Sequence, residues 1–274
     1  MKPRSSQWPR SPLTVCVLTY GPHFDLVHRC IESIRTHTDR ALYQLVVGAN
    51  AVGPQTDAYL RELHRAGAID RIHRSRRNIN KCPMMRRMFR EVKTPFICWF
   101  DDDSYLIEPR TLERQLKLAR RSSANTMMWG ARAKCNHPCL FIDIPDVDKF
   151  VRTARWYRGL TPPSMRPGGR GEFNYQGTNN GNSWWEFLLG GFWLIRTRAI
   201  RALDWPDRRL KKLGDDVLLG EALRQQGWTI QHTAERGVAI DQAARRGDEG
   251  GLAPARLQRR RRPRQVAAMA EEFR

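Results

Sequence analysis

The chain has 274 residues, with 48 Lys and Arg against 28 Asp and Glu, so its formal net charge is +20. Hydrophobic residues at 41% and aromatic residues at 9% exclude a wholly disordered chain. The apolar runs are too short for a membrane span or a signal peptide, and six Cys are too few for a disulfide scaffold. We therefore expect a soluble protein of a reducing compartment, and most simply a monomer.

Strand and helix patterns alternate through the first half of the chain. Short apolar, β-branched runs predict strands over residues 13–19, 43–48, 69–72 and 95–100. Apolar residues spaced three and four apart predict helices over residues 25–37, 56–66 and 84–92. The alternation is typical of βαβ units on a parallel sheet. We expect an α/β fold with a mostly parallel central sheet flanked by helices.

The second half is less regular. Gly, Pro and Asn are frequent over residues 143–185, which predicts a mobile functional loop. Regular structure resumes at residues 187–195, followed by a short helix from Thr197. A further helix begins at Asp215 and ends near Gln226 at the C-cap residue Gly227. Strands over residues 229–231 and 238–240 complete a domain over residues 1–244.

The positive charge is spread over this domain and a short tail. Residues 245–274 hold nine Arg and four acids, a net +5, which leaves +15 for residues 1–244. A GC-rich genome would explain the 40 Arg among the 48 cations, but not the excess itself. Such an excess concentrates polyanions, and the guanidinium group suits phosphate. We expect nucleic-acid contact, with an anionic membrane or an acidic glycan as alternatives. The flexible tail would contribute Arg259, Arg260, Arg261 and Arg262.

An acidic motif follows the apolar strand at residues 96–100. Asp101, Asp102 and Asp103 are consecutive, and crowded like charges repel unless a cation or a proton compensates them. Alternate residues of an extended segment share a face, so Asp101 and Asp103 can point at one ion. Oxygen ligands suit Mg²⁺ or Mn²⁺ bridging substrate phosphates. The alternative is an acidic turn before a helix over residues 108–119.

A second acidic pair, Asp215 and Asp216, opens the last predicted helix. Carboxylates at a helix N-terminus are ordinary capping residues, and that is the alternative here. The earlier acidic motif, and Gly190 with Gly191 between the two motifs, favour a functional role.

These motifs, in this order, resemble the nucleotide-sugar-dependent glycosyltransferases of the GT-A fold, most closely the inverting family 2. The residues that carry the resemblance are the strand end at residues 17–20, Trp99 to Asp103, and Gly190-Gly191-Phe192 followed by Gly214-Asp215-Asp216. It covers about residues 13–242. It implies a nucleotide-binding half over about residues 11–107, an acceptor-side half over 108–244, a UDP-sugar donor and Mn²⁺ or Mg²⁺.

The resemblance also implies site residues. Those at the nucleotide sugar would be Thr19, Tyr20, Asn50, Asn80, Arg86, Asp101, Asp102, Gly190 and Gly191. Asp103 and Asp101 would hold the metal, with Asp241 or His232 as a third ligand, and Asp216 beside Asp215 would be the catalytic base. Asn50 stands where the family usually has an Asp that reads uracil, so uridine specificity is less firmly implied.

Two further groups of residues have two interpretations each. Cys135, His137 and Cys139, with Cys82 as a fourth ligand, would suit zinc, but one close pair of thiols is more typical of incidental cysteines. Cations interleaved with aromatic residues suit stacking on a base and binding of phosphate, with a buried Trp156 as the alternative. The residues are Arg155, Trp156, Tyr157, Arg158, Arg170, Trp184 and Trp185.

The basic composition favours a polymeric anion as acceptor. Together with the run from Trp99 to Ser104 it resembles the base-J type of glucosyltransferase, which glucosylates a hydroxymethyl group on a DNA base. The resemblance implies metal-dependent, inverting transfer of a sugar, glucose, from a UDP-sugar to a hydroxymethylated pyrimidine in duplex DNA. Because that group has relatives in phage, it also implies the cytoplasm of a bacterium or of a phage-infected cell. One alternative is the same chemistry on a glycan, a protein or a small molecule. A second is a sugar-nucleotide pyrophosphorylase, which would need a Gly-rich nucleotide loop. The third is a basic DNA-binding module without catalysis.

Overall fold

A computed structural model describes residues 11–130, 140–141, 144, 146–160, 172–173, 186–188, 190–212, 214–233 and 237–241. The chain divides into two compact units, Met1–Ile240 and Asp241–Arg274. The fold below is that of the first unit.

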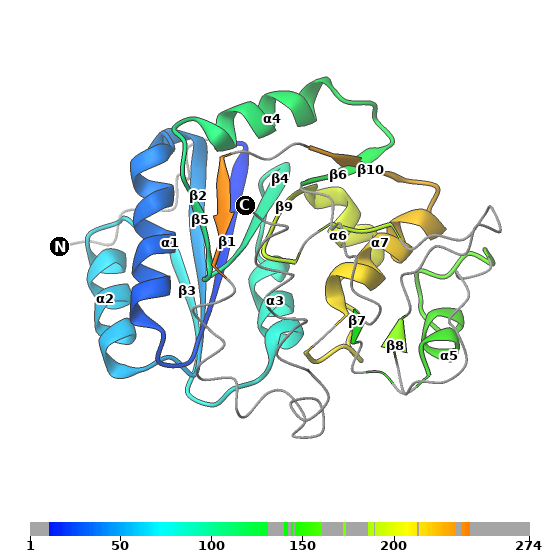
Figure 1. Cartoon of the computed structure of the whole chain (residues 1–274), viewed down its shortest axis with the longest axis horizontal. Coiled ribbons are helices and arrows are strands. Elements are labelled where there is room, and N and C mark those ends of the chain that lie inside the picture. The colour runs from blue at the N-terminus through cyan, green and yellow to red at the C-terminus, as the bar shows by residue number, and fades with distance from the viewer. Residues whose placement is uncertain are drawn as a thin grey trace, which may run out of the picture. The chain divides into compact units, whose positions relative to one another are not determined.

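Seven strands form the central sheet, in the order β10-β6-β9-β4-β1-β2-β3 (Figure 1). Neighbouring strands are parallel, except that β9 runs antiparallel to β4 and β6. This confirms the expected α/β class with a mostly parallel sheet. The strands are β1 (Leu13–Tyr20), β2 (Tyr43–Asn50), β3 (Arg71–Ser75), β4 (Phe96–Asp101), β6 (Thr126–Gly130), β9 (Phe192–Arg196) and β10 (Thr229–His232). Two short antiparallel pairs lie outside it: β5 (Ser104–Leu106) with β11 (Val238–Ile240), and β7 (Leu140–Phe141) with β8 (Glu172–Phe173).

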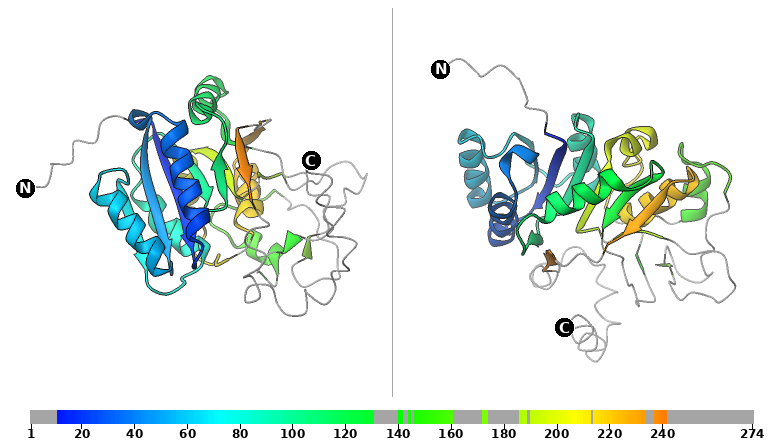
Figure 2. Two further views of the ribbon diagram at one scale, coloured as in Figure 1. Left: turned by 60° about the vertical axis from the view of Figure 1, so that its left-hand side comes forward. Right: turned by 90° about the horizontal axis from the view of Figure 1, so that it is seen from above.

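Helices cover both faces of this sheet (Figure 2). One core contains α1 (Phe24–His37), α2 (Pro54–Arg65) and α4 (Thr111–Arg121). The other contains α3 (Lys81–Arg90), α5 (Val147–Arg152), α6 (Thr197–Leu203) and α7 (Asp215–Gln225). A short 3-10 turn, Arg40–Leu42, precedes β2. The helices in the described part of the chain are each too short or too polar to cross a membrane.

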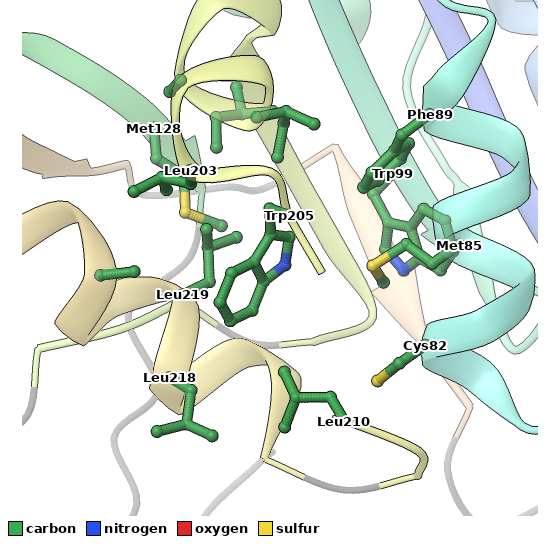
Figure 3. Packing of buried hydrophobic residues seen from close by; sticks show 14 of the residues in the cluster. Cys82, Met85, Phe89, Trp99, Met128, Leu203, Trp205, Leu210, Leu218 and Leu219 are labelled. Carbon is green, nitrogen blue, oxygen red and sulfur yellow. The ribbon is translucent and has the colours of Figure 1, made fainter. Parts of the chain in front are cut away.

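The apolar runs of the strands are long because both of their faces are buried. Side chains alternate along a strand, so Cys98 and Phe100 of β4 enter the core of α1, α2 and α4, whereas Trp99 enters the other. There Trp99 stacks on Trp193 of β9, with ring centroids 5.8 Å apart. Figure 3 shows Trp99 and α3 across from the leucines of α7. The second core therefore joins the helix that follows β3 to the helix that begins at Asp215.

Most predicted elements form where the sequence places them. The predicted strand at residues 69–72 is displaced to 71–75, because Ile69 still belongs to the turn after α2 and donates its N–H to Leu63 O. The helix predicted over residues 84–92 begins three residues earlier, at Lys81. The helix expected from Asp215 ends as predicted, with Gly227 at a φ of 69° just after it.

The interpretation of residues 143–185 as one mobile loop is wrong for its described part. Residues 147–152 form α5, whose N-cap Asp146 accepts a hydrogen bond from the N–H of Lys149 at 2.9 Å. Val147, Phe150 and Val151 are spaced three and four apart and are buried. The surrounding Gly and Pro residues hid this short amphipathic turn. Strand β6 was not predicted either, although its residues 127–129 are apolar and buried.

The parallel strands end together at one edge of the sheet. Tyr20, Asn50, Asp101 and His232 are the last residues of β1, β2, β4 and β10. Strand β9 begins at the same edge, where the N–H of Asp101 donates to Gly191 O at 2.9 Å. In open α/β sheets this edge is where ligands bind. The fold therefore assembles segments far apart in sequence at a single edge.

Candidate active site

The three consecutive aspartates have different surroundings. Asp102 is buried, and its Oδ2 accepts the backbone N–H of Tyr20 at 3.0 Å, which ties β4 to the end of β1. Asp101 points the other way: its Oδ1 accepts the indole Nε1–H of Trp99 at 3.1 Å. Asp103 is also buried, beside Ser104, whose hydroxyl lies 3.4 Å from its Oδ1. The Asp102 side chain thus stabilises the contact between β4 and β1, whereas the Asp101 side chain belongs to the candidate site.

Lys81 joins the two acidic motifs. Its Nζ lies 3.1 Å from Asp101 Oδ2 and 3.3 Å from Asp215 Oδ2. Only 20% of the Lys81 side chain is exposed, and 7% of Asp215. The sequence interpretation did not select Lys81. One signal was available: a lysine in the first turn of a helix opposes the helix dipole, so another interaction has to hold it there.

The charges of this cluster do not balance. Burial lowers the pKa of Lys81, but Asp101, Asp215 and Asp216 outweigh burial and leave that pKa above its usual value. Burial raises the pKa of Asp103 to about 7, and the charge of Asp101 adds to the effect. Burial and the charge of Asp215 raise the pKa of Asp216 to about 6. The pKa of Asp215 is also raised by burial, although Lys81 opposes the shift. One ammonium therefore faces more carboxylates than it can neutralise.

Asp216 lies in the first turn of α7, and its two carboxylate oxygens have different neighbours. Its Oδ1 accepts the N–H of Val217 at 2.9 Å. A Cβ at Gly190 would lie 3.2 Å from Asp216 Oδ2 and 3.5 Å from Lys81 Nζ. Gly190 therefore borders the same small space as the carboxylate and the ammonium, and only a glycine leaves that space open.

The loop before α3 is held by amide side chains. Asn50 is buried: its Oδ1 accepts the N–H of Ile79 at 2.9 Å, and its Nδ2 donates to Asn78 Oδ1 at 2.9 Å. Asn78 Oδ1 also accepts the N–H of Asn80 at 2.8 Å. Asn80 has φ 71° and ψ 169°, a conformation that only glycine adopts without strain. These bonds hold the strained residue that precedes Lys81. Asn50 therefore supports the loop, and its described bonds use the groups expected to read a base.

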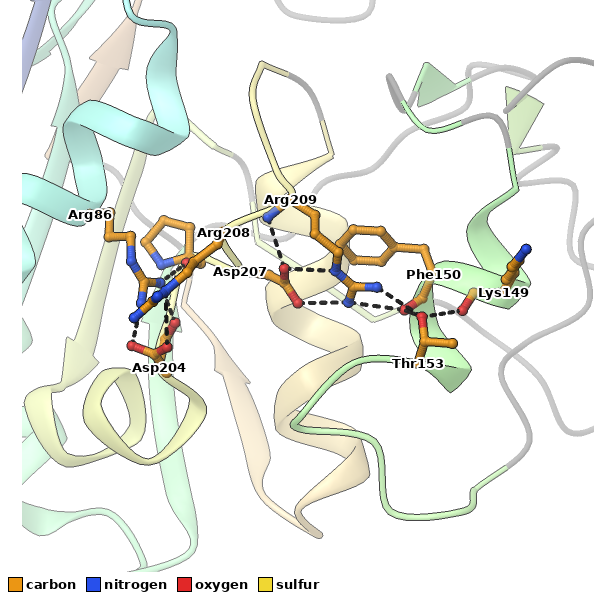
Figure 4. A network of polar contacts seen from close by, with 9 residues as sticks. Arg86, Lys149, Phe150, Thr153, Asp204, Asp207, Arg208 and Arg209 are labelled. Carbon is orange, nitrogen blue, oxygen red and sulfur yellow. Dashed lines mark hydrogen bonds and ion pairs between the residues drawn. The ribbon is translucent and has the colours of Figure 1, made fainter.

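Arg86 is bound to the segment that follows α6. Its guanidinium donates to the carbonyl oxygens of Asp204 and Pro206, and it pairs with the Asp204 carboxylate at 2.5 Å (Figure 4). Five residues of an α-helix turn through about 500°, so Arg86 and Lys81 face different directions on α3. The contact of Arg86 with the nucleotide sugar stays a prediction, and Lys81 is the cation of α3 that contacts Asp101 and Asp215.

The segment between α6 and α7 is fastened from both sides. Arg86 holds its start, and Arg209 pairs with Asp207 at 2.8 Å and donates to Phe150 O and Thr153 Oγ1 (Figure 4). The N–H of Cys82 donates to Lys211 O at 3.0 Å. This segment leads directly into Asp215 and Asp216, so these contacts determine where the acidic pair lies.

Other residues predicted for the nucleotide side line the strand ends. Thr19 is buried and its hydroxyl donates to Gly48 O at 3.3 Å, so its side chain links β1 to β2. Tyr20 is half-buried at the end of β1. A Cβ at Gly191 would come within 2.7 Å of Ser104 Oγ, so a glycine is needed for β9 to approach the acidic motif.

The third metal ligand was expected to be His232 or Asp241. His232 Nε2 pairs with Glu186 Oε1 at 2.6 Å, and strands β6 and β9 lie between β10 and β4. His232 is thus directed to Glu186. Asp241 is half-buried and belongs to the second unit of the chain. The described residues include no group of three or more His, Cys, Asp and Glu arranged as a metal site.

The predicted acceptor residues divide into two groups. Trp156 is 1% exposed within the second core, so the prediction that it stacks on a base is wrong, and the alternative of a core residue holds. Tyr157 is half-buried against the same core. Arg155 and Arg158 are exposed, and the N–H of Arg158 donates to Gln225 Oε1 at 2.9 Å, which fastens this segment to the end of α7.

Several predicted residues lie outside the described part of the chain. They are Arg170, Trp184, Trp185, Arg259, Arg260, Arg261 and Arg262, and the proposed zinc ligands Cys135, His137 and Cys139. Cys82, the fourth zinc candidate, is a buried free thiol in the second core.

The chemistry of the donor set fits a divalent cation. Mg²⁺ typically takes one or two carboxylates together with phosphate and water oxygens. The buried Asp103, whose pKa is raised by burial and by Asp101, gains from a nearby cation. Asp103 and Asp101 are the residues that would hold the ion, and the diphosphate would supply further oxygens.

Comparison with protein families gives one result. The model of a family described as glycosyltransferase like family 2 matches residues 9–263. A search of curated proteins finds no match.

Solved structures with a similar fold include those of a mannosyltransferase and of TarS. The mannosyltransferase PcManGT from Pyrobaculum calidifontis, in complex with GDP-Man and Mn²⁺, has a TM-score of 0.54 and 12% identity, covering 81% of this chain and 54% of that one. TarS 1-349 of S. aureus has a TM-score of 0.52 and 14% identity, covering 82% and 59%. A second structure of this TarS fragment contains UDP. The chain thus spans 54% of the mannosyltransferase chain, 59% of the TarS fragment and 36% of a longer TarS chain, and the likeness concerns the fold.

Proposed function

The chain belongs to the family of glycosyltransferases like family 2, and from this premise we propose that it transfers a sugar, glucose, from a UDP-sugar to a hydroxymethylated pyrimidine in DNA, with inversion. The observation that carries the catalytic part is the cluster of charges in which Lys81 links Asp101 of the donor-side motif to Asp215 at the start of α7. Asp216 is directed to the same space, beside Gly190.

The proposed reaction needs one base and one leaving group. The acceptor oxygen attacks the anomeric carbon while the bond from that carbon to the diphosphate oxygen breaks, and the electron pair leaves with the diphosphate. The hydroxyl proton passes to the Asp216 carboxylate, which serves as general base. Displacement from the side opposite the leaving group inverts the anomeric carbon. With its Oδ1 held by the N–H of Val217, Asp216 has its Oδ2 available for the proton.

Negative charge develops on the diphosphate as it leaves. Preorganised cations lower the barrier to such a step, and Lys81 is one, because its Nζ is fixed between two carboxylates. A Mn²⁺ or Mg²⁺ ion held by Asp103 and Asp101 would act as a Lewis acid on the same oxygens. The bound GDP-Man with Mn²⁺ and the bound UDP of the two similar folds support a nucleotide-sugar donor with a metal.

The acceptor is proposed from the charge around the pocket. Arg76 and Arg77 are exposed just before the loop that leads to Lys81, and Lys211 and Lys212 are exposed just before Asp215. The bond from Cys82 to Lys211 places this pair beside the start of α3. Exposed basic groups in the two segments that lead to Lys81 and to Asp215 suit a polymer with regularly spaced phosphates. DNA would have to present its base unstacked, at a cost of a few kcal/mol.

The test is a transfer assay with the full chain. UDP-glucose labelled in the sugar is incubated with Mn²⁺ and either 5-hydroxymethyl-pyrimidine DNA or the same duplex with unmodified pyrimidines. We expect label only in the modified duplex, and removal of the metal with EDTA should abolish incorporation. GDP-mannose serves as the competing donor.

Two results would contradict the proposal in different ways. Label in a glycan or a small molecule, with none in any modified duplex, would replace the acceptor and retain the chemistry. Unchanged DNA binding, together with unchanged transfer, in both Asp103→Asn and Asp216→Asn variants would show that these carboxylates are structural.

A further inference from the structure

Lys81 contacts Asp101, one of the two carboxylates that would hold a metal ion. Its ammonium pairs with Asp101 Oδ2 at 3.1 Å, and the indole N–H of Trp99 donates a hydrogen bond to Oδ1 of the same carboxylate at 3.1 Å. The Lys81 ammonium also lies 5.9 Å from the centre of the Trp99 ring. Both oxygens of Asp101 are therefore engaged before any ligand arrives.

The lysine is bound from both halves of the site. Asp215, on α7, lies 3.3 Å from Lys81 Nζ and is 7% exposed. The backbone of Lys81 is constrained by the preceding residue, Asn80, whose strained conformation is held by hydrogen bonds with Asn78 and, through it, Asn50. The ammonium is thus held between the two acidic motifs, and the flexible stem of the lysine allows it to shift by a short distance.

A divalent cation entering this pocket alone would meet that ammonium. Two positive charges compete for the same carboxylates and repel each other at short range. A nucleotide diphosphate changes the balance, because its negative oxygens attract both cations. Metal and nucleotide should then stabilise each other at this site, which is a coupling between two ligands.

We propose that Lys81 is a built-in counter-ion that prevents the acidic pocket from binding a divalent cation by itself, and that makes metal binding conditional on the nucleotide diphosphate, which then shares the Lys81 ammonium. Lys81 is in this role a positioning residue for Asp101 and Asp215. The inference rests on the proposed function for the presence of a metal and a nucleotide sugar, but it requires no particular sugar and no acceptor.

The experiment is a titration of the full chain with Mn²⁺, with free Mn²⁺ followed by electron paramagnetic resonance, in the absence and in the presence of UDP. Lys81→Met removes the ammonium, Lys81→Arg keeps the charge, and Lys117→Met is the matched control, because Lys117 is an exposed lysine on α4. Without UDP, we expect Lys81→Met to bind Mn²⁺ at least tenfold more tightly than the wild type. Lys81→Arg and Lys117→Met should stay close to the wild type. With UDP, the gain in Lys81→Met should shrink or reverse, since the diphosphate has lost one of its cations.

Equal or weaker Mn²⁺ binding by Lys81→Met without UDP, in a variant whose circular dichroism matches that of the wild type, would overturn the proposal. Should Lys81→Met fail to fold, Lys81→Gln gives the same comparison with a shorter polar side chain. The titration contains no acceptor, so a failure of the DNA transfer assay leaves its result interpretable. If wild-type Mn²⁺ affinity is the same with and without UDP, the conditional binding proposed here is wrong, whatever the acceptor is.

Discussion

Asp216 and Lys81 illustrate what single residues contribute. Asp216 looks in sequence like any carboxylate in the first turn of a helix, and Asp25 occupies an equivalent position on α1. The difference is that Asp216 borders Gly190 and the Lys81 ammonium, whereas Asp25 is exposed. The proposed chemistry therefore depends on the neighbours of Asp216, and its removal can be compared with that of Asp25.

Asp216→Asn is expected to lower kcat by roughly 10²- to 10⁴-fold, because the amide cannot take the acceptor proton. KM for the nucleotide sugar should change little. Single-turnover transfer with the acceptor identified in the assay above is the measurement, and Asp25→Asn is the control. If Asp216→Asn keeps more than half of the wild-type rate, Asp216 is not the base.

The pH profile should report the same carboxylate. Burial and the charge of Asp215 raise the pKa of Asp216 to about 6. A raised pKa means that the ionised form is lost at a higher pH than for an ordinary Asp. The value of kcat/KM should therefore be constant above this pH and fall about tenfold per unit below it. Asp215→Asn removes the second cause and should move the fall to lower pH. A profile that stays flat down to pH ~4.5 would contradict this assignment.

Asn80 stores strain beside the site, with φ 71° and ψ 169°. Asn80→Gly removes the Cβ that makes this conformation costly, and strain of about 1–3 kcal/mol exceeds the entropy that a glycine adds to the unfolded chain. We expect Tm to rise by roughly 2–4 °C in Asn80→Gly. Asn80→Ala retains the Cβ and should not raise Tm. Equal Tm values for the two variants, measured by circular dichroism, would show that the conformation is not strained.

At the scale of elements, α7 links the parts of the site. Asp216 lies at its start, and near its end Gln225 donates to Leu160 O at 2.7 Å and accepts from the N–H of Arg158. Gly220 lies in the middle of the helix, where a Cβ would come within 2.0 Å of Glu186 O. One helix thus carries the proposed base, the segment at residues 158–160 and a close backbone contact.

Gly220→Ala should destabilise the protein by about 1–3 kcal/mol, because the clash is with backbone. The sign of the change in the free energy of unfolding is informative, since alanine in place of an unpacked helical glycine stabilises a protein by about 1 kcal/mol. Urea unfolding gives the free energy of unfolding, with Glu62→Ala on the exposed side of α2 as a control. A more stable Gly220→Ala variant would mean that residue 186 does not pack closely on α7.

At the scale of the whole molecule, the charge of +20 has two origins. Basic side chains occupy the last turns of α1, α2, α3 and α4, where they complement the negative ends of the helix dipoles. Helices α1, α2 and α3 each follow a parallel strand and return along it, so their last turns lie at the edge opposite the candidate site. Helix α4 already begins at that opposite edge, where the N–H of Arg110 donates to His37 O. This part of the charge is explained by the fold. The exposed Arg76, Arg77, Lys211 and Lys212 beside the site are the cations that argue for a polyanionic acceptor.

DNA binding should therefore depend steeply on salt. For about six phosphate contacts, affinity falls by roughly 10³-fold between 50 and 200 mM salt. Fluorescence anisotropy with a labelled duplex measures this slope, and reversal of charge at Arg76 and Arg77 should reduce it, whereas reversal at Arg120 and Arg121, in the last turn of α4, should not. An affinity that is insensitive to salt would exclude the phosphate-contact model.

The sequence determined the local features of this protein, because they depend on short-range periodicity and on runs of like residues. The strands β1, β2 and β4, the helices α1, α2 and α7 and the two acidic motifs all follow from residues within one segment. Strand β6 and helix α5 were not predicted from the sequence, because five or six residues carry too little periodic pattern.

Only the tertiary structure decided which cation of α3 contacts the two acidic motifs. Lys81 and Arg86 are five residues apart on one helix, and packing against the segment at residues 204–212 directs Arg86 to Asp204 and Lys81 to Asp101 and Asp215. The tertiary structure also decided that Trp156 is buried, because burial depends on contacts between residues distant in sequence.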